Sequence, residues 1–599
     1  MNKKLTPFYL LAVAVALTAT ACTQRVADPY AGLDQDTLVV RAARFSEGAH
    51  MVALKDSVTS LRFVLQEREL LPFNQANIHQ TTEQAKLGPA ADKPFFTVRL
   101  ALPIPPAYTP TEQAELTGID GGVYHHNHSP GFEIMPNGDA LAIYFSTPMG
   151  LAEKDPATTF IQARLRHGSE DWDMPELFFE TIGGNDQSGL LWNDNGKIWF
   201  FGGGRSMSEY VPFRIATSTD NGFHWEFSVP QLDTIATDYT AQPVSSAFRD
   251  PAGNIYFVCD GKGSTSFLWR SSDEGKTWVD MGGRTGTRHS TIVPLDEEGN
   301  LISMGGKNNN CEGWNVKNFS SDWGATWSEN EPSYFPVLGT AQRPSLIRLE
   351  SGALLYVGDG FAHKRKIAPP KEWEHGYNAV VAISDDEGET WKIKELPAQL
   401  PQHRRPPYGT LGYCTVRQAP NGVIHLLTTV NYPNLHYEFN EAWVRSDAGE
   451  VPLETEGGEI KSYTEYYDNG ALKSKWSARI CPDGRYLLHG EQKDYFDSGV
   501  LEHEVCYENG RKCGIERFYT KQGTLRWQWE RDLKSNRGVW THYHPNGAKR
   551  IVSRWNLRPE PRDLKRAFYG YVAEGQTLHF DEEGNQTASY IFKNGVLQE

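Results

Sequence analysis

A short turn motif occurs four times between residues 218 and 391, and it limits the possible folds more than any other feature of the sequence. Each copy starts with Ser, has an Asp two positions later and a Gly four positions later, and ends on a Trp. The Asp can accept backbone N–H bonds in a tight turn, the Gly can adopt a positive φ, and the Trp can bury its ring beneath a hairpin. The copies are Ser218–Trp225, Ser271–Trp278, Ser320–Trp327 and Ser384–Trp391. Their even spacing predicts one structural unit repeated along the chain.

A second series of segments interleaves with these turns. Each consists of an apolar strand, a turn containing Gly and another apolar strand, at residues 129–145, 188–201, 244–258, 290–304, 345–357 and 414–430. Four-stranded blades stacked around an axis close such an array without exposed sheet edges. We therefore predict an all-β chain with a six- or seven-bladed β-propeller over residues 111–450. Residues 22–110 are expected to form a β-rich segment or the closure of the propeller.

The pattern changes after residue 455. A Gly is followed five positions later by Tyr and four positions after that by a second Gly, in copies that begin at Gly490, Gly514 and Gly538, with a looser copy at Gly575. This spacing resembles MORN-like repeats of the YwqK antitoxin type, which are stacked hairpins in an elongated sheet. The resemblance implies that residues 455–599 form a scaffold or an interaction module, with a protein partner as the expected ligand.

The N-terminus indicates export. Basic residues, an apolar run over residues 5–17 and small residues at positions 19–21 precede Cys22, so residues 1–21 are interpreted as a signal peptide. The position of Cys22 resembles a bacterial lipobox, which implies an acylated cysteine that tethers the chain to a membrane surface. We expect an outer-membrane or cell-surface lipoprotein. An ordinary cleaved signal is the alternative, and it would give a periplasmic or secreted protein.

Charge and cysteine content restrict the partners. The net charge of −16 argues against nucleic acid, because no excess of Lys and Arg is available to neutralise phosphates. Any polyanionic substrate would therefore need a local basic cleft. The remaining cysteines are scattered; Cys506 and Cys513 flank a turn and could pair across a hairpin, and no CxxC spacing supports a zinc site.

Histidines gather in the segment that leads into the first predicted hairpin, Tyr124-His125-His126-Asn127-His128. In an extended chain Tyr124, His126 and His128 share one face, and His125 and Asn127 share the other. Segments of this kind line the axis of a propeller. The corresponding segments of the other hairpins carry Gln187, Gln242, Arg288-His289, Gln342-Arg343 and Gly412-Tyr413. We therefore predict a ring of imidazole, guanidinium, phenol and amide groups around the axis.

Such a ring suits an acidic sugar. Arg can hold a carboxylate through two hydrogen bonds, and His can act as a base near neutral pH. We predict β-elimination on a uronate, with His126 or His128 and Tyr413 as the acid and base. The predicted substrate-binding residues are Tyr124, His125, Asn127, Arg288, His289 and Arg343. No cofactor is expected. The spacing of His126 and His128 suits a structural metal ion, but no acidic or Cys cluster nearby completes a ligand set.

Two family resemblances bear on this interpretation. The four turns resemble the Asp-box, or bacterial neuraminidase repeat (BNR), in whose family the motif is structural and lies away from the active site. Residues 342–348 and 412–443 are similar to bacterial sialidase-like propellers, and Phe213-Arg214-Ile215 resembles their arginine signature except that Ala216 replaces proline.

The residues Tyr124–His128 are similar in composition to the axial site of propeller ulvan lyases, which use His, Tyr and Arg. This second resemblance competes with the first and implies a polysaccharide lyase that cleaves an acidic, uronate-containing, ulvan-like polysaccharide, sulfated or not. A sialidase-like exo-glycoside hydrolase and a non-catalytic glycan-binding surface lipoprotein are the alternatives.

Overall fold

The computed structural model describes most of the chain from residue 37 to residue 598. The described residues are 37–42, 44–47, 62–67, 76–101, 113, 115–118, 128–148, 151–153, 155–205, 213–228, 230–232, 239–307, 310–362, 366–399, 401–402, 405–429, 434–557 and 572–598.

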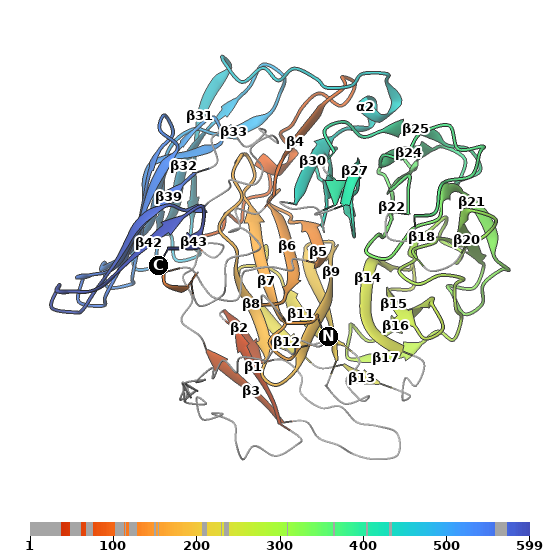
Figure 1. Cartoon of the computed structure of the whole chain (residues 1–599), viewed down its shortest axis with the longest axis horizontal. Helices are drawn as coiled ribbons and strands as arrows, with labels where there is room; N and C mark the ends of the chain where they lie inside the picture. The colour runs from red at the N-terminus through yellow and green to blue at the C-terminus, as the bar shows by residue number, and fades with distance from the viewer. Residues whose placement is uncertain are drawn as a thin grey trace, which may run out of the picture.

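Six antiparallel four-stranded units make up the larger part of the molecule (Figure 1). The first blade consists of β5 (His128–Ile134), β6 (Ala140–Ser146), β7 (Thr159–Leu165) and β8 (Glu176–Thr181). The second consists of β9 (Asn185–Asp194), β10 (Lys197–Arg205), β11 (Arg214–Ser218) and β12 (Trp225–Ser228). The third consists of β14 (Tyr239–Arg249), β15 (Ile255–Gly261), β16 (Thr265–Ser271) and β17 (Thr277–Asp280). The fourth blade consists of β18 (Thr291–Pro294), β19 (Leu301–Met304), β20 (Trp314–Ser320) and β21 (Glu331–Pro336). The fifth consists of β22 (Ser345–Arg348), β23 (Leu354–Gly358), β24 (Val380–Ser384) and β25 (Lys392–Glu395). The sixth consists of β28 (Thr415–Gln418), β29 (Ile424–Leu427), β30 (Leu435–Phe439) and β4 (Phe96–Leu100).

The inner strands of these blades contact one another in a closed ring, in the order β5, β9, β14, β18, β22, β28 and back to β5. The predicted all-β propeller is thus confirmed, with six blades among the described residues. The N-terminal strand β4 completes the sixth blade by pairing antiparallel with β30, from Leu100 opposite Leu435 to Phe96 opposite Phe439. Pairing between strands from the two ends of the propeller closes the ring.

Short strands extend several blades at their outer edges. The strands β1 (Thr37–Ala42) and β3 (Arg62–Glu67) join the first blade, β2 (Phe45–Glu47) joins the second, and β13 (Gln231–Leu232) pairs with β17 of the third. A separate two-stranded sheet is formed by β26 (Pro401–Gln402) and β27 (Arg405–Gly409). Two short helices, η1 (Gln84–Lys86) and α2 (Glu441–Arg445), are described in full, and no helix among the described residues is long and apolar enough to cross a membrane.

The four repeated turns share one set of hydrogen bonds. In each copy the Ser hydroxyl donates to the Asp carboxylate at 2.8–2.9 Å and accepts the Gly N–H at 2.9–3.0 Å. The four Gly residues have φ between 76° and 90°, where a side chain would be strained. Trp225, Trp278 and Trp391 also donate their indole N–H to the carbonyl of their own Gly. These residues therefore serve the fold, as the sequence predicts.

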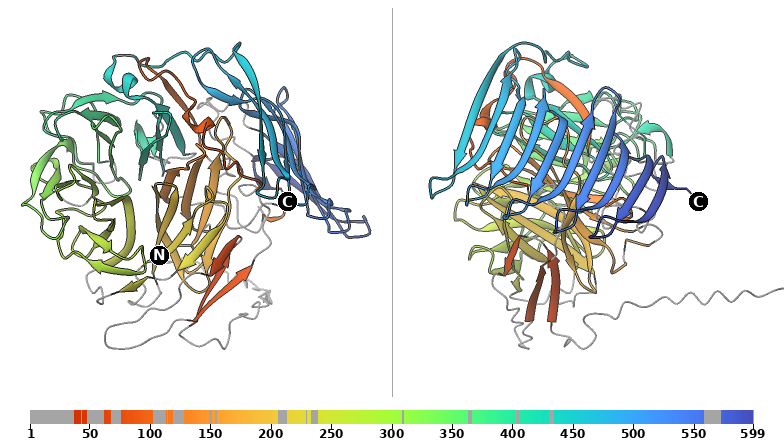
Figure 2. Two further views of the ribbon diagram at one scale, coloured as in Figure 1. Left: turned by 180° about the vertical axis from the view of Figure 1, so that it is seen from behind. Right: turned by 90° about the vertical axis from the view of Figure 1, so that its left-hand side faces the viewer.

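The C-terminal residues form one sheet of thirteen strands (Figure 2). The strands are β31 (Glu459–Tyr466), β32 (Leu472–Ile480), β33 (Tyr486–Leu488), β34 (Gly490–Tyr495), β35 (Leu501–Glu508), β36 (Arg511–Tyr519), β37 (Leu525–Asp532), β38 (Arg537–Tyr543), β39 (Lys549–Asn556), β40 (Val572–Ala573), β41 (Gly575–Phe580), β42 (Gln586–Lys593) and β43 (Val596–Leu597). The register shifts just before each repeated aromatic residue, namely Tyr466, Tyr495, Tyr519, Tyr543 and Phe580. The sequence repeat thus corresponds to one hairpin with one bulge.

One face of this sheet packs on the first propeller blade, with the sheet running along one side of the propeller (Figures 1 and 2). Trp527, Trp529 and Trp540 of the sheet share a buried cluster with Phe132 and Tyr144 of the blade. Burying these large rings removes several hundred Å² of apolar surface from water, so the two parts stabilise each other.

Candidate functional site

Left-handed backbone conformations recur where the chain leads into the inner strands. The φ angle is 50° at Ser129, 63° at Ser188, 61° at His289 and 63° at Gly412. A residue other than Gly pays about 1–3 kcal/mol for such a conformation, which persists mainly at functional sites. Side chains next to these positions, from blades far apart in the sequence, meet one another.

Tyr413 lies at the centre of this cluster. The His128 ring stacks on it with centroids 4.2 Å apart and planes at 24°, and the His289 ring meets it edge-on at 5.0 Å. The Lys307 ammonium donates to the Tyr413 hydroxyl and lies 4.7 Å from the ring centroid. The Arg343 guanidinium lies 5.5 Å from the same centroid. The structure therefore brings together His128, His289, Arg343 and Tyr413, all of which the sequence places in the predicted ring.

Arg288 and His289 share a buried carboxylate. Asp260, at the end of β15, accepts from Arg288 Nε at 2.6 Å, and its Oδ2 lies 2.7 Å from His289 Nδ1. The His289 backbone N–H also donates to Asp260 at 2.8 Å, and Arg288 contacts the Gln242 side-chain oxygen. The Asp260 side chain is fully buried, whereas that of Arg288 is 26% exposed. Asp260 thus fixes a guanidinium that still reaches solvent, which is the arrangement that a carboxylate-binding Arg needs.

Burial and neighbouring charges together set the charge states of Asp260 and His289. Burial by itself would raise the pKa of Asp260, but its contacts with His289 and Arg288 outweigh that effect and lower the pKa to about 2. Burial also lowers the pKa of His289 to about 3. His289 is therefore a neutral imidazole in contact with an ionised carboxylate, and it positions its neighbours without accepting a proton.

Lys307 is the titratable group of the cluster that changes charge near neutral pH. Burial lowers its pKa to about 7, and the charges of Arg288 and Arg343 act in the same direction, against Asp260 and Glu153. Burial raises the pKa of Tyr413, which stays a neutral phenol. A phenol that touches an amine with a pKa near 7 forms a proton-donating pair.

Sequence reasoning missed Lys307, Asp260 and Glu153. A local signal exists for Lys307, because Gly305 and Gly306 precede it. A Cβ on Gly306 would lie 1.9 Å from the Arg288 carbonyl oxygen, so only Gly allows the bridge in which the Lys307 N–H donates to that carbonyl at 2.8 Å. Such a close approach explains why two glycines stand at this strand end.

Five predicted residues lie outside the described part of the chain, namely Cys22, Tyr124, His125, His126 and Asn127. Their predicted roles in lipidation, catalysis and substrate binding stay predictions. His128, the first described residue of this segment, starts β5 and is 5% exposed. The choice between His126 and His128 as the base is therefore a matter for experiment.

Comparison with known proteins identifies a BNR repeat-like domain at residues 138–426. This span contains all four repeated turns, in agreement with the Asp-box resemblance of the sequence. None of the curated proteins compared with the chain matches it.

Solved structures give distant matches. A protein of unknown function from Dyadobacter fermentans shares 15% identity with a TM-score of 0.42, over 57% of this chain and 99% of that one. An intramolecular trans-sialidase from Ruminococcus gnavus shares 12% identity with a TM-score of 0.40, over 55% and 97% of the two chains. The NanB sialidase from Streptococcus pneumoniae shares 11% identity with a TM-score of 0.38, over 53% and 68%. Matches this remote give no information about the activity of this chain.

Proposed function

We propose that the axial cluster binds a carboxylate-bearing sugar and that the protein is a polysaccharide lyase acting on an acidic, uronate-containing polysaccharide. The observation that supports this most is the approach of Lys307 and Arg343 to Tyr413, with Arg288 joined to Lys307 by a backbone bridge. In a chain with net charge −16, two guanidinium groups and an amine that is charged below about pH 7 make a local site for an anion.

The proposed reaction is a β-elimination. A base removes the C5 proton of the uronate, a double bond forms between C4 and C5, and the C4–O4 bond breaks with transfer of a proton to O4. Arg288, held by Asp260 and partly exposed, neutralises the carboxylate, which makes the C5 proton more acidic.

Tyr413 supplies the proton to O4 in this proposal. Burial keeps its pKa raised, so the hydroxyl carries a proton to give. The ammonium of Lys307, which donates to the same oxygen, stabilises the phenolate that results and returns a proton to it. The base is an imidazole, His126 or His128, as the sequence predicts.

A hydrolase of the sialidase-like kind is the second candidate. The sialidase resemblance implies a Tyr nucleophile activated by Glu. The hydroxyl of Tyr413 instead receives a hydrogen bond from a cation, which favours proton donation over activation as a nucleophile. A propeller that only binds glycan is the third candidate, because the fold hosts binding and catalysis alike.

The test is an incubation of the purified protein with a panel of uronate-rich polysaccharides, sulfated and unsulfated. Near-ultraviolet absorbance reports the C4–C5 double bond. We expect absorbance to rise with wild type and with Tyr334→Phe, which changes an exposed tyrosine, but not with Tyr413→Phe.

Three other outcomes would each contradict the proposal. Release of a free acidic sugar without absorbance would identify a hydrolase. Binding without any product, lost in Arg288→Ala, would identify a glycan-binding protein. Equal absorbance from wild type and Tyr413→Phe would remove Tyr413 from the reaction.

A further inference from the structure

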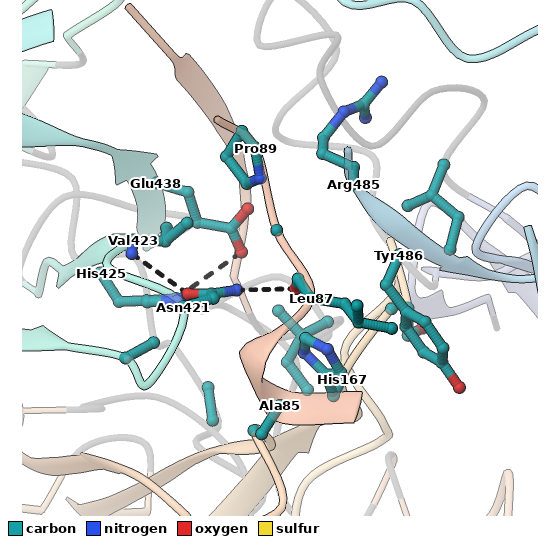
Figure 3. Close-up of a pocket in the computed structure, with 18 of the residues that line it drawn as sticks. Ala85, Leu87, Pro89, His167, Asn421, Val423, His425, Glu438, Arg485 and Tyr486 are labelled. Atoms are coloured by element: carbon teal, nitrogen blue, oxygen red, sulfur yellow. Dashed lines mark hydrogen bonds and ion pairs between the residues drawn. The ribbon is translucent and has the colours of Figure 1, made fainter. Parts of the chain in front are cut away.

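A cavity outside the axial cluster lies between the sixth propeller blade and the C-terminal sheet (Figure 3). Its volume is about 70 Å³, and none of the axial residues lines it. Its wall includes Arg99 of β4, His425 of β29, Glu438 of β30, and Arg485 and Tyr486 from the C-terminal sheet. The proposed function makes no use of these groups.

Three side chains of this blade, those of His425, His436 and Glu438, bring one possible ligand atom each to within 4.8 Å of the others. His425 stands opposite Glu438 in the register of β29 and β30, and His436 lies two residues before Glu438, on the same face of β30. His425 Nδ1 lies 3.0 Å from His436 Nε2 and 3.6 Å from Glu438 Oε1, and His436 Nε2 lies 3.9 Å from Glu438 Oε1. The three side chains are between 0% and 14% exposed.

These distances match the ligand set of a metal ion. The nearest point equidistant from the three atoms lies in their plane, about 2.05 Å from each, and an ion slightly out of that plane, as a tetrahedral shell requires, lies about 2.1–2.2 Å from each. Zinc bonds to imidazole nitrogen and carboxylate oxygen measure about 2.0–2.2 Å. We propose that His425, His436 and Glu438 bind a divalent transition-metal ion of the zinc type. The set is also chemically suitable, because the two imidazoles favour zinc over magnesium or calcium, and zinc accepts a carboxylate as a further ligand.

The surroundings fit an ion with three protein ligands and one open position. His425 and Glu438 line the cavity, so water from the cavity can complete a tetrahedral shell. Arg99 grips Glu438 with two hydrogen bonds of 2.6 and 2.9 Å and fixes the direction of the carboxylate, as outer partners of metal ligands do.

The charge of Arg99 is balanced locally. Glu170 lies 3.7 Å from the guanidinium, so two buried carboxylates face one buried guanidinium before any ion enters. The two carboxylates therefore offset the repulsion between the guanidinium and an entering divalent cation. Since Arg99 belongs to the closing strand β4, the ion would hold together β29, β30 and, through Arg99, the closure of the propeller.

The experiment uses the full protein, stripped with a chelator and then loaded with Co²⁺ or Zn²⁺. We expect one Co²⁺ per chain with the intense visible absorption of a tetrahedral site, and a higher melting temperature with Zn²⁺. Both effects should disappear in His425→Gln and Glu438→Gln and persist in His375→Gln, a histidine outside the cluster. Substoichiometric metal in wild type, or equal metal content in all variants, would overturn the proposal.

A second readout does not depend on the variants folding. In wild type loaded with Co²⁺, each ligating imidazole gives a paramagnetically shifted N–H proton signal in the NMR spectrum. We expect two such signals. No shifted signal, or a number other than two, would show that the His425–His436 contact is a hydrogen bond without a metal or that the ion binds elsewhere.

Discussion

The ammonium of Lys307 donates to the hydroxyl of Tyr413 while lying 4.7 Å from the centroid of the same ring. The two residues are 106 positions apart in the chain, and they lie near strand ends of the fourth and sixth blades. Lys307 also pairs with Arg288 through a backbone bridge. Lys307 thus contacts both the proposed proton donor and the residue proposed to bind the carboxylate. The protonation state of Lys307 should therefore influence both of them.

Replacing Lys307 with Met should stabilise the protein in a pH-dependent way. Burial lowers the pKa of Lys307 from 10.5 to about 7, so between these two values the unfolded chain binds more protons than the folded one. Wild-type stability at this site therefore rises with pH from about 7 to 10.5, and below pH 7 the folded state carries the whole cost of the buried charge. In urea unfolding below pH 7, the unfolding free energy of Lys307→Met should exceed that of wild type by at most about 5 kcal/mol. This difference should shrink towards pH 10. A gap that does not change with pH would contradict the lowered pKa.

Tyr413→Phe should abolish turnover while leaving binding nearly intact. The substitution removes the proton donor but keeps the ring on which His128 stacks. Loss of a general acid lowers the rate by about 10²- to 10⁴-fold. Calorimetric binding of a polysaccharide should stay within a few-fold of wild type. A comparable loss of binding and rate would instead show that Tyr413 mainly contacts the substrate.

Asp260→Asn should weaken substrate binding through Arg288. The amide cannot balance the guanidinium or accept the same charge-assisted hydrogen bonds from Arg288 and His289, each worth about 1.5–3 kcal/mol. We expect KM to rise more than kcat falls, with a loss of a few kcal/mol in the free energy of unfolding. Asp296→Asn, at an exposed turn, is the matched control. If KM stayed at the wild-type value, Arg288 would not depend on Asp260 for its position.

The sequence predicts the propeller well because its signal is local. The turn motif and the strand spacing act within single blades, and each copy carries its own hydrogen bonds. Residues that lead into inner strands, such as Arg288 and Tyr413, follow from the same repeat. Asp260 and Lys307 do not, because each stands at the end of a second strand and becomes functional only when neighbouring blades meet. The metal-ligand triangle is similar: His425 and His436 are 11 residues apart, and only the register of β29 and β30 brings them together.

Two glycine substitutions should separate backbone strain from steric clash. Gly275 and Gly352 have φ of +84° and +90°, so alanine costs about 1 kcal/mol of backbone strain at either position. A Cβ on Gly275 would also lie 2.6 Å from the Trp199 ring, whereas one on Gly352 meets nothing within 4 Å. Gly275→Ala should therefore lose 1–3 kcal/mol more than Gly352→Ala in chemical denaturation. Equal losses would mean that Trp199 moves aside at no cost.

Cys506 and Cys513 should form a disulfide in an oxidising compartment. They stand directly opposite each other on β35 and β36, with their sulfur atoms 3.0 Å apart, so a small movement brings them to bonding distance. A small-molecule disulfide such as oxidised glutathione accepts the two electrons; both thiols lose their protons and a sulfur–sulfur bond forms. Burial raises the pKa of Cys513, so the reaction should speed up at alkaline pH. After alkylation under denaturing conditions, mass spectrometry should find these two cysteines protected and Cys311 alkylated. Because the closed loop is short, the gain in unfolding free energy should not exceed about 2.5 kcal/mol, and full alkylation of both residues after oxidation would refute the pairing.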